Sequence, residues 1–116
     1  MRHKNKGKIL DRSKADREMM LRNMASSVLM YEKIKTTTVK AKTVRSLVEK
    51  LISIAKEDTL TARRKLIKIL PQKMAVKKAL EVLGPRFKDK NGGYTRITRL
   101  SNRKGDGAEV VLLELL

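Results

Sequence analysis

The sequence predicts an α+β fold, with about four helices packed on a small two- or three-stranded sheet and a basic N-terminal extension. Apolar residues recur every three or four positions in four stretches before Gly84, and the pattern changes to two strand-like stretches after it. Residues 1–12 show neither period, so we expect a basic flexible arm there. Because the chain has only 116 residues, we expect a single globular domain over residues 13–116.

The first two helices flank a short extended segment. Ser13 followed by Asp16 is typical of a helix start, and this helix is expected to end near Glu32. The segment "IKTTT" is rich in β-branched residues and predicts one brief strand or extended crossing segment, after which Thr37 or Thr38 caps a second helix. The apolar faces comprise Leu21, Met24, Ala25, Val28 and Tyr31 in the first helix, and Ala41, Val44, Leu47, Val48, Leu51, Ile52 and Ala55 in the second.

Cations occupy the first turns of this second helix, at Lys40, Lys42 and Arg45. The helix dipole places positive partial charge at this end, so cations there are unfavourable within the chain alone. Their position indicates an external anion.

Two shorter helices are predicted before the strands. Asp58 or Thr59 caps the first, and Pro71 is expected in the first turn of the second. Gly84 followed by Pro85 predicts the end of the second helix. The apolar faces are Ala62, Leu66 and Ile69 in the first, and Val76, Ala79, Leu80 and Leu83 in the second.

The two strand-like stretches are "YTRITRLS" and "AEVVLLELL", and the turn "NRKGDG" lies between them. The last stretch is nearly all apolar, which predicts an inner strand covered by helices.

Charge sets this chain apart from an ordinary globular domain. Lys and Arg number 29 against 12 Asp and Glu, which gives a net charge of +17. Because such a chain repels itself, we expect a densely negative partner, namely nucleic acid, an anionic membrane surface or an acidic protein. The sequence contains no apolar run long enough to span a membrane, no secretory signal and no cysteine, so we expect a cytoplasmic protein without a membrane partner, disulfides or thiolate metal sites.

No set of residues in the sequence forms a catalytic constellation. The single histidine, His3, lies in the arm without a fixed neighbour. Glu57 and Asp58 are adjacent at a helix boundary, where a cap and a solvated neighbour are the commoner roles. Gly92 and Gly93 lack the preceding strand and following helix of a nucleotide-binding loop. We expect no enzyme, no metal, no cofactor and no small-molecule substrate.

The stretch "GPRFKDKNGGYTRITRL" favours RNA as the partner. Its cations neutralise phosphates, its Gly-Gly pair lets backbone amides approach a phosphate, and Tyr94 offers a flat ring and a hydroxyl. The sequence has no helix-turn-helix spacing, zinc module or zipper of a duplex-DNA reader. Basic patches on separate elements, together with an arm that can thread among strands, indicate a large folded RNA.

Six short blocks resemble, in order and spacing, the family of bacterial large-subunit ribosomal protein seventeen: "MRH", "RNMA", "IKTT", "KAK", "GPR" and "GGYTRI". The resemblance covers nearly the whole chain. It implies a structural constituent of the large ribosomal subunit that binds large-subunit ribosomal RNA, beside neighbouring ribosomal proteins and near the exit of the nascent-peptide tunnel. The matching positions implied to face RNA are Arg2, His3, Arg12, Arg22, Asn23, Lys35, Thr36, Lys40, Lys42, Arg86, Gly93, Tyr94 and Arg96. Lys4, Lys6, Lys8 and Lys14 join them on charge alone.

Two stretches depart from the family pattern. Asp11 is an acid in an arm that the family usually keeps neutral or basic there, and the segment from Thr59 to Leu83 matches only loosely beyond "ARR", so no contact is transferred inside it. Two rival functions stay open. One is a nucleoid-type DNA-binding protein, and the other is a small magnesium-dependent RNA-processing enzyme that uses Glu57, Asp58 or Asp106.

Overall fold

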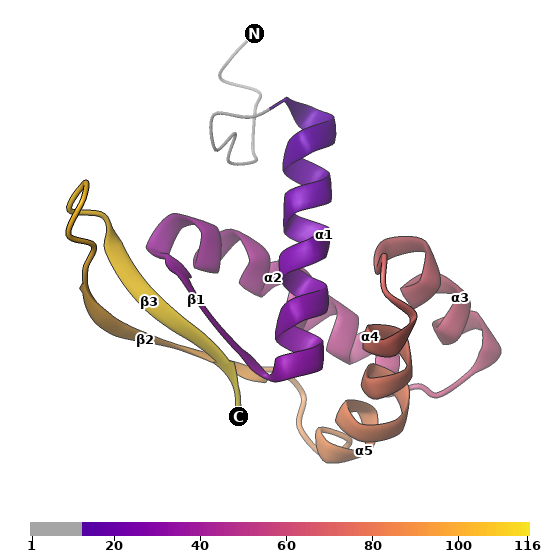
Figure 1. Ribbon diagram of the computed structural model, residues 1–116. Helices are drawn as coiled ribbons and strands as arrows, with labels where there is room; N and C mark the ends of the chain where they lie inside the picture. The colour runs from indigo at the N-terminus through magenta and orange to yellow at the C-terminus, as the bar shows by residue number, and fades with distance from the viewer. Residues whose placement is uncertain (1–12) are drawn as a thin grey trace, which may run out of the picture.

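The structure is a computed structural model that describes residues 13–116. Its elements follow the order α1, β1, α2, α3, α4, α5, β2 and β3 (Figure 1). The helices α1 and α2 lie next to the three-stranded sheet, and α3 to α5 lie on the far side of these helices from the sheet (Figure 1). The predicted α+β class is confirmed. The predictions made for residues 1–12 lie outside the described part of the chain.

The first helix, α1 (Lys14–Tyr31), begins and ends where the sequence predicts. The hydroxyl of Ser13 accepts a hydrogen bond from the backbone N–H of Asp16 at 3.2 Å, which satisfies one free donor of the first turn. Glu32 ends the helix in the left-handed conformation, with φ of 68°. Tyr31 is 68% exposed, so its expected place on the apolar face is wrong.

The short strand β1 (Lys33–Thr37) leads directly into α2 (Thr38–Ala55). Thr37 occupies the capping position, but its side chain makes no capping hydrogen bond. The predicted apolar face of α2 is buried, and only Leu47 within it is partly exposed. This face packs α2 against the rest of the core and fixes its first turn beside β1.

The two helices α3 (Leu60–Ile69) and α4 (Lys73–Lys78) are short. Thr59 caps α3, because its hydroxyl accepts a hydrogen bond from the N–H of Ala62 at 3.1 Å. Pro71 precedes α4 and is not part of its first turn, contrary to the prediction. Gln72 takes the capping position instead.

The chain stays helical past the predicted stop. After α4 it continues through a π-helical turn (Ala79–Leu83) into α5 (Gly84–Arg86), so the expected helix end at Gly84 is wrong. The N–H of Gly84 donates to the carbonyl five residues back, and this wider turn accommodates Pro85, which has no N–H. Gly84 serves close packing instead, because a Cβ there would lie 2.7 Å from the carbonyl oxygen of Ala55 in α2.

We therefore expect Gly84→Ala to lower the free energy of unfolding by about 1–3 kcal/mol, the usual cost of overpacking. Equilibrium unfolding in urea measures this difference. The matched control is Gly105→Ala, because a Cβ at Gly105 meets no atom within 4 Å. Equal stability of the two variants would show that the contact between Gly84 and α2 is not as close as described.

The sheet has the order β1-β3-β2, and both pairs are antiparallel. The strands β2 (Thr95–Asn102) and β3 (Glu109–Leu115) pair as a hairpin across the predicted turn, and β3 is the inner strand, as expected. Residues of β3 alternate between a buried face toward the helices and a half-exposed open face. The buried side chains of β3 are Val111, Leu113 and Leu115.

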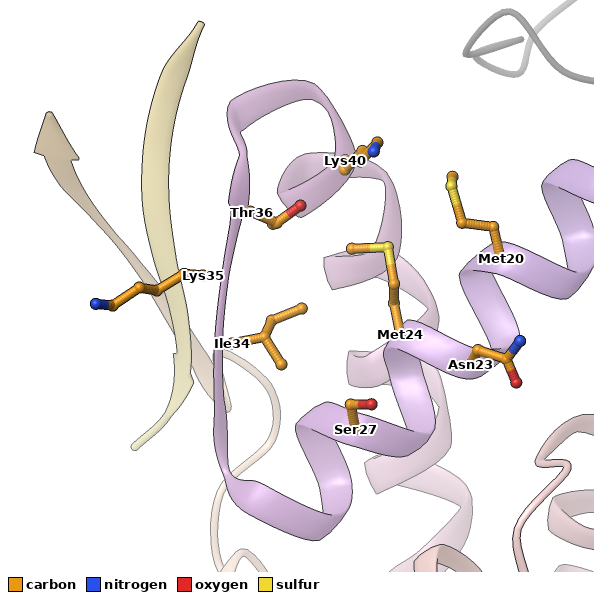
Figure 2. Close-up of a pocket in the computed structure, with 8 residues that line it drawn as sticks. All are labelled: Met20, Asn23, Met24, Ser27, Ile34, Lys35, Thr36 and Lys40. Carbon is orange, nitrogen blue, oxygen red and sulfur yellow. The ribbon is translucent and has the colours of Figure 1, made fainter. Parts of the chain in front are cut away.

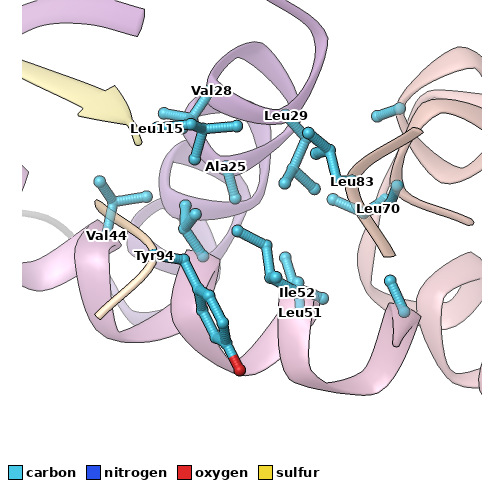
Figure 3. Packing of buried hydrophobic residues seen from close by; sticks show 14 of the residues in the cluster. Ala25, Val28, Leu29, Val44, Leu51, Ile52, Leu70, Leu83, Tyr94 and Leu115 are labelled. Carbon is cyan, nitrogen blue, oxygen red and sulfur yellow. The ribbon is translucent and has the colours of Figure 1, made fainter. Parts of the chain in front are cut away.

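One apolar core joins α1, α2, the helical segment over residues 73–86 and β3 (Figure 3). Leu29 of α1, Ile52 of α2 and Leu83 are fully buried in it. Tyr94, just before β2, also belongs to this core. The core thus holds the start of α2 at a fixed place between α1 and the sheet.

Candidate nucleic-acid interface

A groove of about 400 Å³ lies between α1, β1 and the first turn of α2 (Figure 2). We call it the α2 groove. Its lining residues are Met20, Asn23, Met24, Ser27, Ile34, Lys35, Thr36 and Lys40. The structure therefore brings together four of the predicted site residues, Asn23, Lys35, Thr36 and Lys40, from three different elements.

Side chains alternate along β1 at this groove. Figure 2 shows Ile34 and Thr36 directed toward the groove and Lys35 directed away from it. In the register of the sheet, Lys35 pairs with Leu112, which belongs to the open face of β3. Lys35 consequently presents its charge on the open face of the sheet and not inside the groove.

A second hollow of about 590 Å³ lies on the other side of α2, toward β2. Lys42, Arg45 and Ile97 are among the residues that line it. The Nε of Arg45 donates a hydrogen bond to the hydroxyl of Thr95 at 3.2 Å, which holds this guanidinium beside β2. Cations thus flank both sides of the N-terminal half of α2. Arg45 is not among the residues that the family resemblance implies to face RNA. It lies three residues after Lys42 and therefore on the same side of α2.

The cations at this end of α2 lack acidic partners in the described part of the chain. None of Lys35, Lys40 and Lys42 forms an ion pair there, and the first turn of α2 contains no acidic residue. The helix dipole adds positive partial charge at the same place, and free backbone N–H groups of a first turn point outward. This arrangement is suited to bind an anion such as phosphate.

Two other predicted site residues have carboxylate partners within the chain. Arg86 forms a two-pronged pair with Glu32, at 2.5 Å from Nη1 and 3.0 Å from Nη2, and Lys78 contacts the same carboxylate at 3.0 Å. Arg96 contacts Glu114 through Nε at 3.0 Å and Nη2 at 2.9 Å. Contact of these arginines with RNA stays a prediction, and the structure gives each of them a role inside the fold.

Glu32 joins the end of α1 to the helical segment over residues 73–86. Hydrogen bonds from Arg86 and then Lys78 lower the pKa of Glu32 from 4.5 to about 2. Because the folded-state pKa lies below the ordinary value, the stabilisation is complete above pH 4.5 and is lost as the pH falls toward 2.

We expect Glu32→Gln to lower the free energy of unfolding at pH 7 by about 1 kcal/mol, a modest value because the pair is partly exposed. The difference between wild type and variant should shrink between pH 4.5 and 2. Urea unfolding of both proteins across this range measures it. A difference that stays constant with pH would contradict the proposed ion pairs.

The expectation that the Tyr94 ring faces RNA is wrong. Tyr94 is 1% exposed, and its ring packs against Phe87 with 5.1 Å between ring centroids. Figure 3 shows the ring beside α2, with the hydroxyl directed away from the apolar side chains. The hydroxyl donates to the carbonyl of Lys90 at 3.1 Å and accepts from Nζ of Lys56 at 3.0 Å, and this bond from Lys56 lowers the pKa of Tyr94. Aromatic residues that bury their rings and satisfy their hydroxyls are ordinary core residues, and the local sequence does not distinguish them from base-stacking ones.

The loop before β2 is held by Glu49 of α2. Its carboxylate accepts hydrogen bonds from the N–H of Tyr94 at 3.1 and 3.0 Å and from the hydroxyl of Thr95 at 3.1 Å. Gly93 has φ of 64°, which favours glycine, and it is exposed. A phosphate contact of its backbone stays a prediction. Sequence reasoning missed Glu49 because its partners lie more than 40 residues away.

Two of the remaining predicted residues lie apart from the α2 groove. Lys14 is exposed at the start of α1, and Arg22 lines a small hollow between α1 and Ile69. The other six lie outside the described residues, namely Arg2, His3, Lys4, Lys6, Lys8 and Arg12.

Residues 13–116 contain no cluster of three or more His, Cys, Asp or Glu side chains that could hold a metal ion. No helix in the same range is both long and apolar enough to span a membrane.

The fold and its charged surface define a class of small, strongly basic α+β proteins in which cations surround the start of one helix, α2. The particular family follows from comparison with known sequences. The sequence model described as ribosomal protein L17 matches residues 20–116, and the chain belongs to this family.

Curated relatives agree with this assignment. The large ribosomal subunit protein bL17 of Solibacter usitatus is 52% identical over 116 residues, which cover 100% of this chain and 77% of that protein. The protein of the same name from Chloroflexus aurantiacus is 47% identical and is covered completely, as is this chain. The one from Syntrophotalea carbinolica is 44% identical, with 100% of this chain and 75% of that protein covered.

Proposed function

We propose that this protein is a structural constituent of the large ribosomal subunit and binds large-subunit ribosomal RNA. The observation that carries the proposal is the set of cations around the start of α2 that have no acidic partner among residues 13–116. The chain has a net charge of +17 and belongs to the ribosomal protein L17 family. Lys40 and Lys42 neutralise phosphates there, and Asn23 and Thr36 contribute uncharged hydrogen-bonding groups in the groove.

The rigid body recognises the shape of folded RNA, and the basic segment over residues 1–12 adds phosphate contacts. In this proposal residues 13–116 form one domain and residues 1–12 an arm. The protein lies near the exit of the nascent-peptide tunnel, as the family resemblance implies, beside other large-subunit proteins in the cytoplasm. It performs no catalysis and requires no cofactor.

Sedimentation tests this function. The protein should sediment with intact large subunits at ordinary salt and leave them only at high salt, because its contacts are mainly with phosphates. Protein that stays free in the supernatant at ordinary abundance would contradict the proposal.

A further inference from the structure

A second basic surface covers α3 and α4, and none of its residues is among the predicted contacts. Six exposed cations form it, and we call it the α3 face: Arg63, Arg64, Lys65, Lys68, Lys73 and Lys77. No acidic residue occurs between Leu60 and Leu80. Within residues 13–116 none of the six forms an ion pair. The charge of this surface is therefore not balanced by the described part of the chain.

The α3 face lies at the opposite end of α2 from the α2 groove. α3 packs on the C-terminal part of α2 and on α4, on the side of the molecule away from the sheet (Figure 1). α2 has 18 residues, which corresponds to a length of about 27 Å. This helix length is roughly three times the Debye length of about 8 Å at physiological salt, so surfaces at the two ends of α2 bind anions independently.

We propose that the α3 face is a second phosphate-binding surface, so that the protein holds two separate segments of ribosomal RNA at the two ends of α2. The proposal rests on the function proposed above. It assigns an RNA-binding role to the segment from Thr59 to Leu83, for which the family resemblance implies no RNA contact.

Composition of the surface favours RNA over an acidic protein as its partner. Four of the six cations are lysines, and lysine is depleted in protein–protein interfaces, whereas it is a common phosphate contact. Arg63 and Arg64 add planar donor groups that match phosphate oxygens. The exposed apolar side chains between them, Leu60, Ile67 and Met74, are single residues dispersed among the charges.

Equilibrium binding of the full chain to intact large-subunit ribosomal RNA, over a series of salt concentrations, tests the proposal. The α3 variant combines Arg63→Gln, Arg64→Gln and Lys68→Gln. The groove variant combines Lys40→Gln in the α2 groove with its two neighbours, Lys35→Gln on the open face of the sheet and Lys42→Gln at the second hollow. A control variant with Lys33→Gln, Lys50→Gln and Lys104→Gln removes the same charge from exposed positions elsewhere. Thermal unfolding checks that all variants fold. We expect the α3 variant to fold because its three replaced side chains are exposed.

The plot of log K against log salt has a negative slope, to which each phosphate contact contributes roughly −0.7 to −0.9. The α3 variant should therefore make this slope less steep by about 2 to 3. The control should change it by less than about 1. When the α3 and groove substitutions are combined, the losses in log K should add, because distant sites act independently. Additive losses in log K distinguish two surfaces that are occupied together from two alternative sites for one RNA segment.

Three results would overturn the second surface while leaving the proposed function intact. The α3 variant could bind like the control while the groove variant binds weakly, the losses could fail to add, or the α3 variant could lose only binding to an acidic ribosomal protein. If neither the α3 nor the groove variant loses affinity for the RNA, the proposed function itself fails.

Discussion

Replacing Lys35, Lys40 and Lys42 together by glutamine will weaken binding to large-subunit ribosomal RNA by roughly 10- to 100-fold at about 0.2 M salt. The reason is the geometry at the start of α2, where these lysines have no acidic partner within residues 13–116 and the helix dipole adds to their charge. Titration of labelled RNA with each protein measures the loss. The fold should be unaffected, since none of the three side chains belongs to the core.

Arg86→Gln with Arg96→Gln provides an informative comparison for this prediction. Both arginines are expected from the sequence to face RNA, yet each contacts a carboxylate of the chain. We expect this pair of substitutions to affect RNA binding less per charge removed than the lysine substitutions. An equal or larger loss of affinity would contradict the importance that we assign to cations without an acidic partner among residues 13–116.

Tyr94→Ala will lower the free energy of unfolding by about 3–5 kcal/mol, the usual cost of truncating a buried aromatic side chain. The ring is enclosed between α2 and Phe87, and the hydroxyl joins Lys56 of α2 to the carbonyl of Lys90. Tyr94→Phe keeps the ring and should cost only about 1 kcal/mol. Urea unfolding of the two variants measures both values.

The same two variants separate a core role from an RNA-contacting role. If Tyr94 acted by stacking on a base, both variants would keep near-normal stability, and Tyr94→Ala would lose RNA affinity while folded. If it acts through the core, as the structure indicates, stability falls steeply for Tyr94→Ala, and folded Tyr94→Phe binds RNA like the wild type.

Most of the fold follows from local signals in the sequence. Ser13 and Thr59 cap their helices as predicted because a hydroxyl beside free N–H groups is favourable in almost any context. The apolar stripe of α2 and the central strand β3 are likewise predicted by their periodicity. These features depend on residues close together in the chain.

The errors arise where distant contacts decide the outcome. Gly84 and Pro85 normally end a helix, but the π-helical turn and the close approach to Ala55 carry the helix through them. Tyr94 lies in a basic stretch that favours exposure, and Glu49, 45 residues earlier, ties its backbone to α2. Neither the partner nor the tight space is visible in a local pattern.

The candidate interface was predictable in part. Lys40 and Lys42 are recognisable from sequence because cations at the positive end of a helix are unusual. Which arginines have internal carboxylate partners depends on tertiary structure, so the difference between Arg86 and Lys40 was not predictable. The α3 face carries a signal in the sequence, namely the absence of acids over 21 positions between Leu60 and Leu80, but its separation from the α2 groove requires the structure.

The central claim is that folded ribosomal RNA balances the excess charge of this protein. Competition between large-subunit ribosomal RNA and random duplex DNA for the full chain at about 0.2 M salt tests it most directly, because non-specific phosphate contacts weaken at that concentration. We predict a strong preference for the RNA. Comparable affinity for both nucleic acids would contradict the claim and favour a nucleoid-type DNA-binding protein.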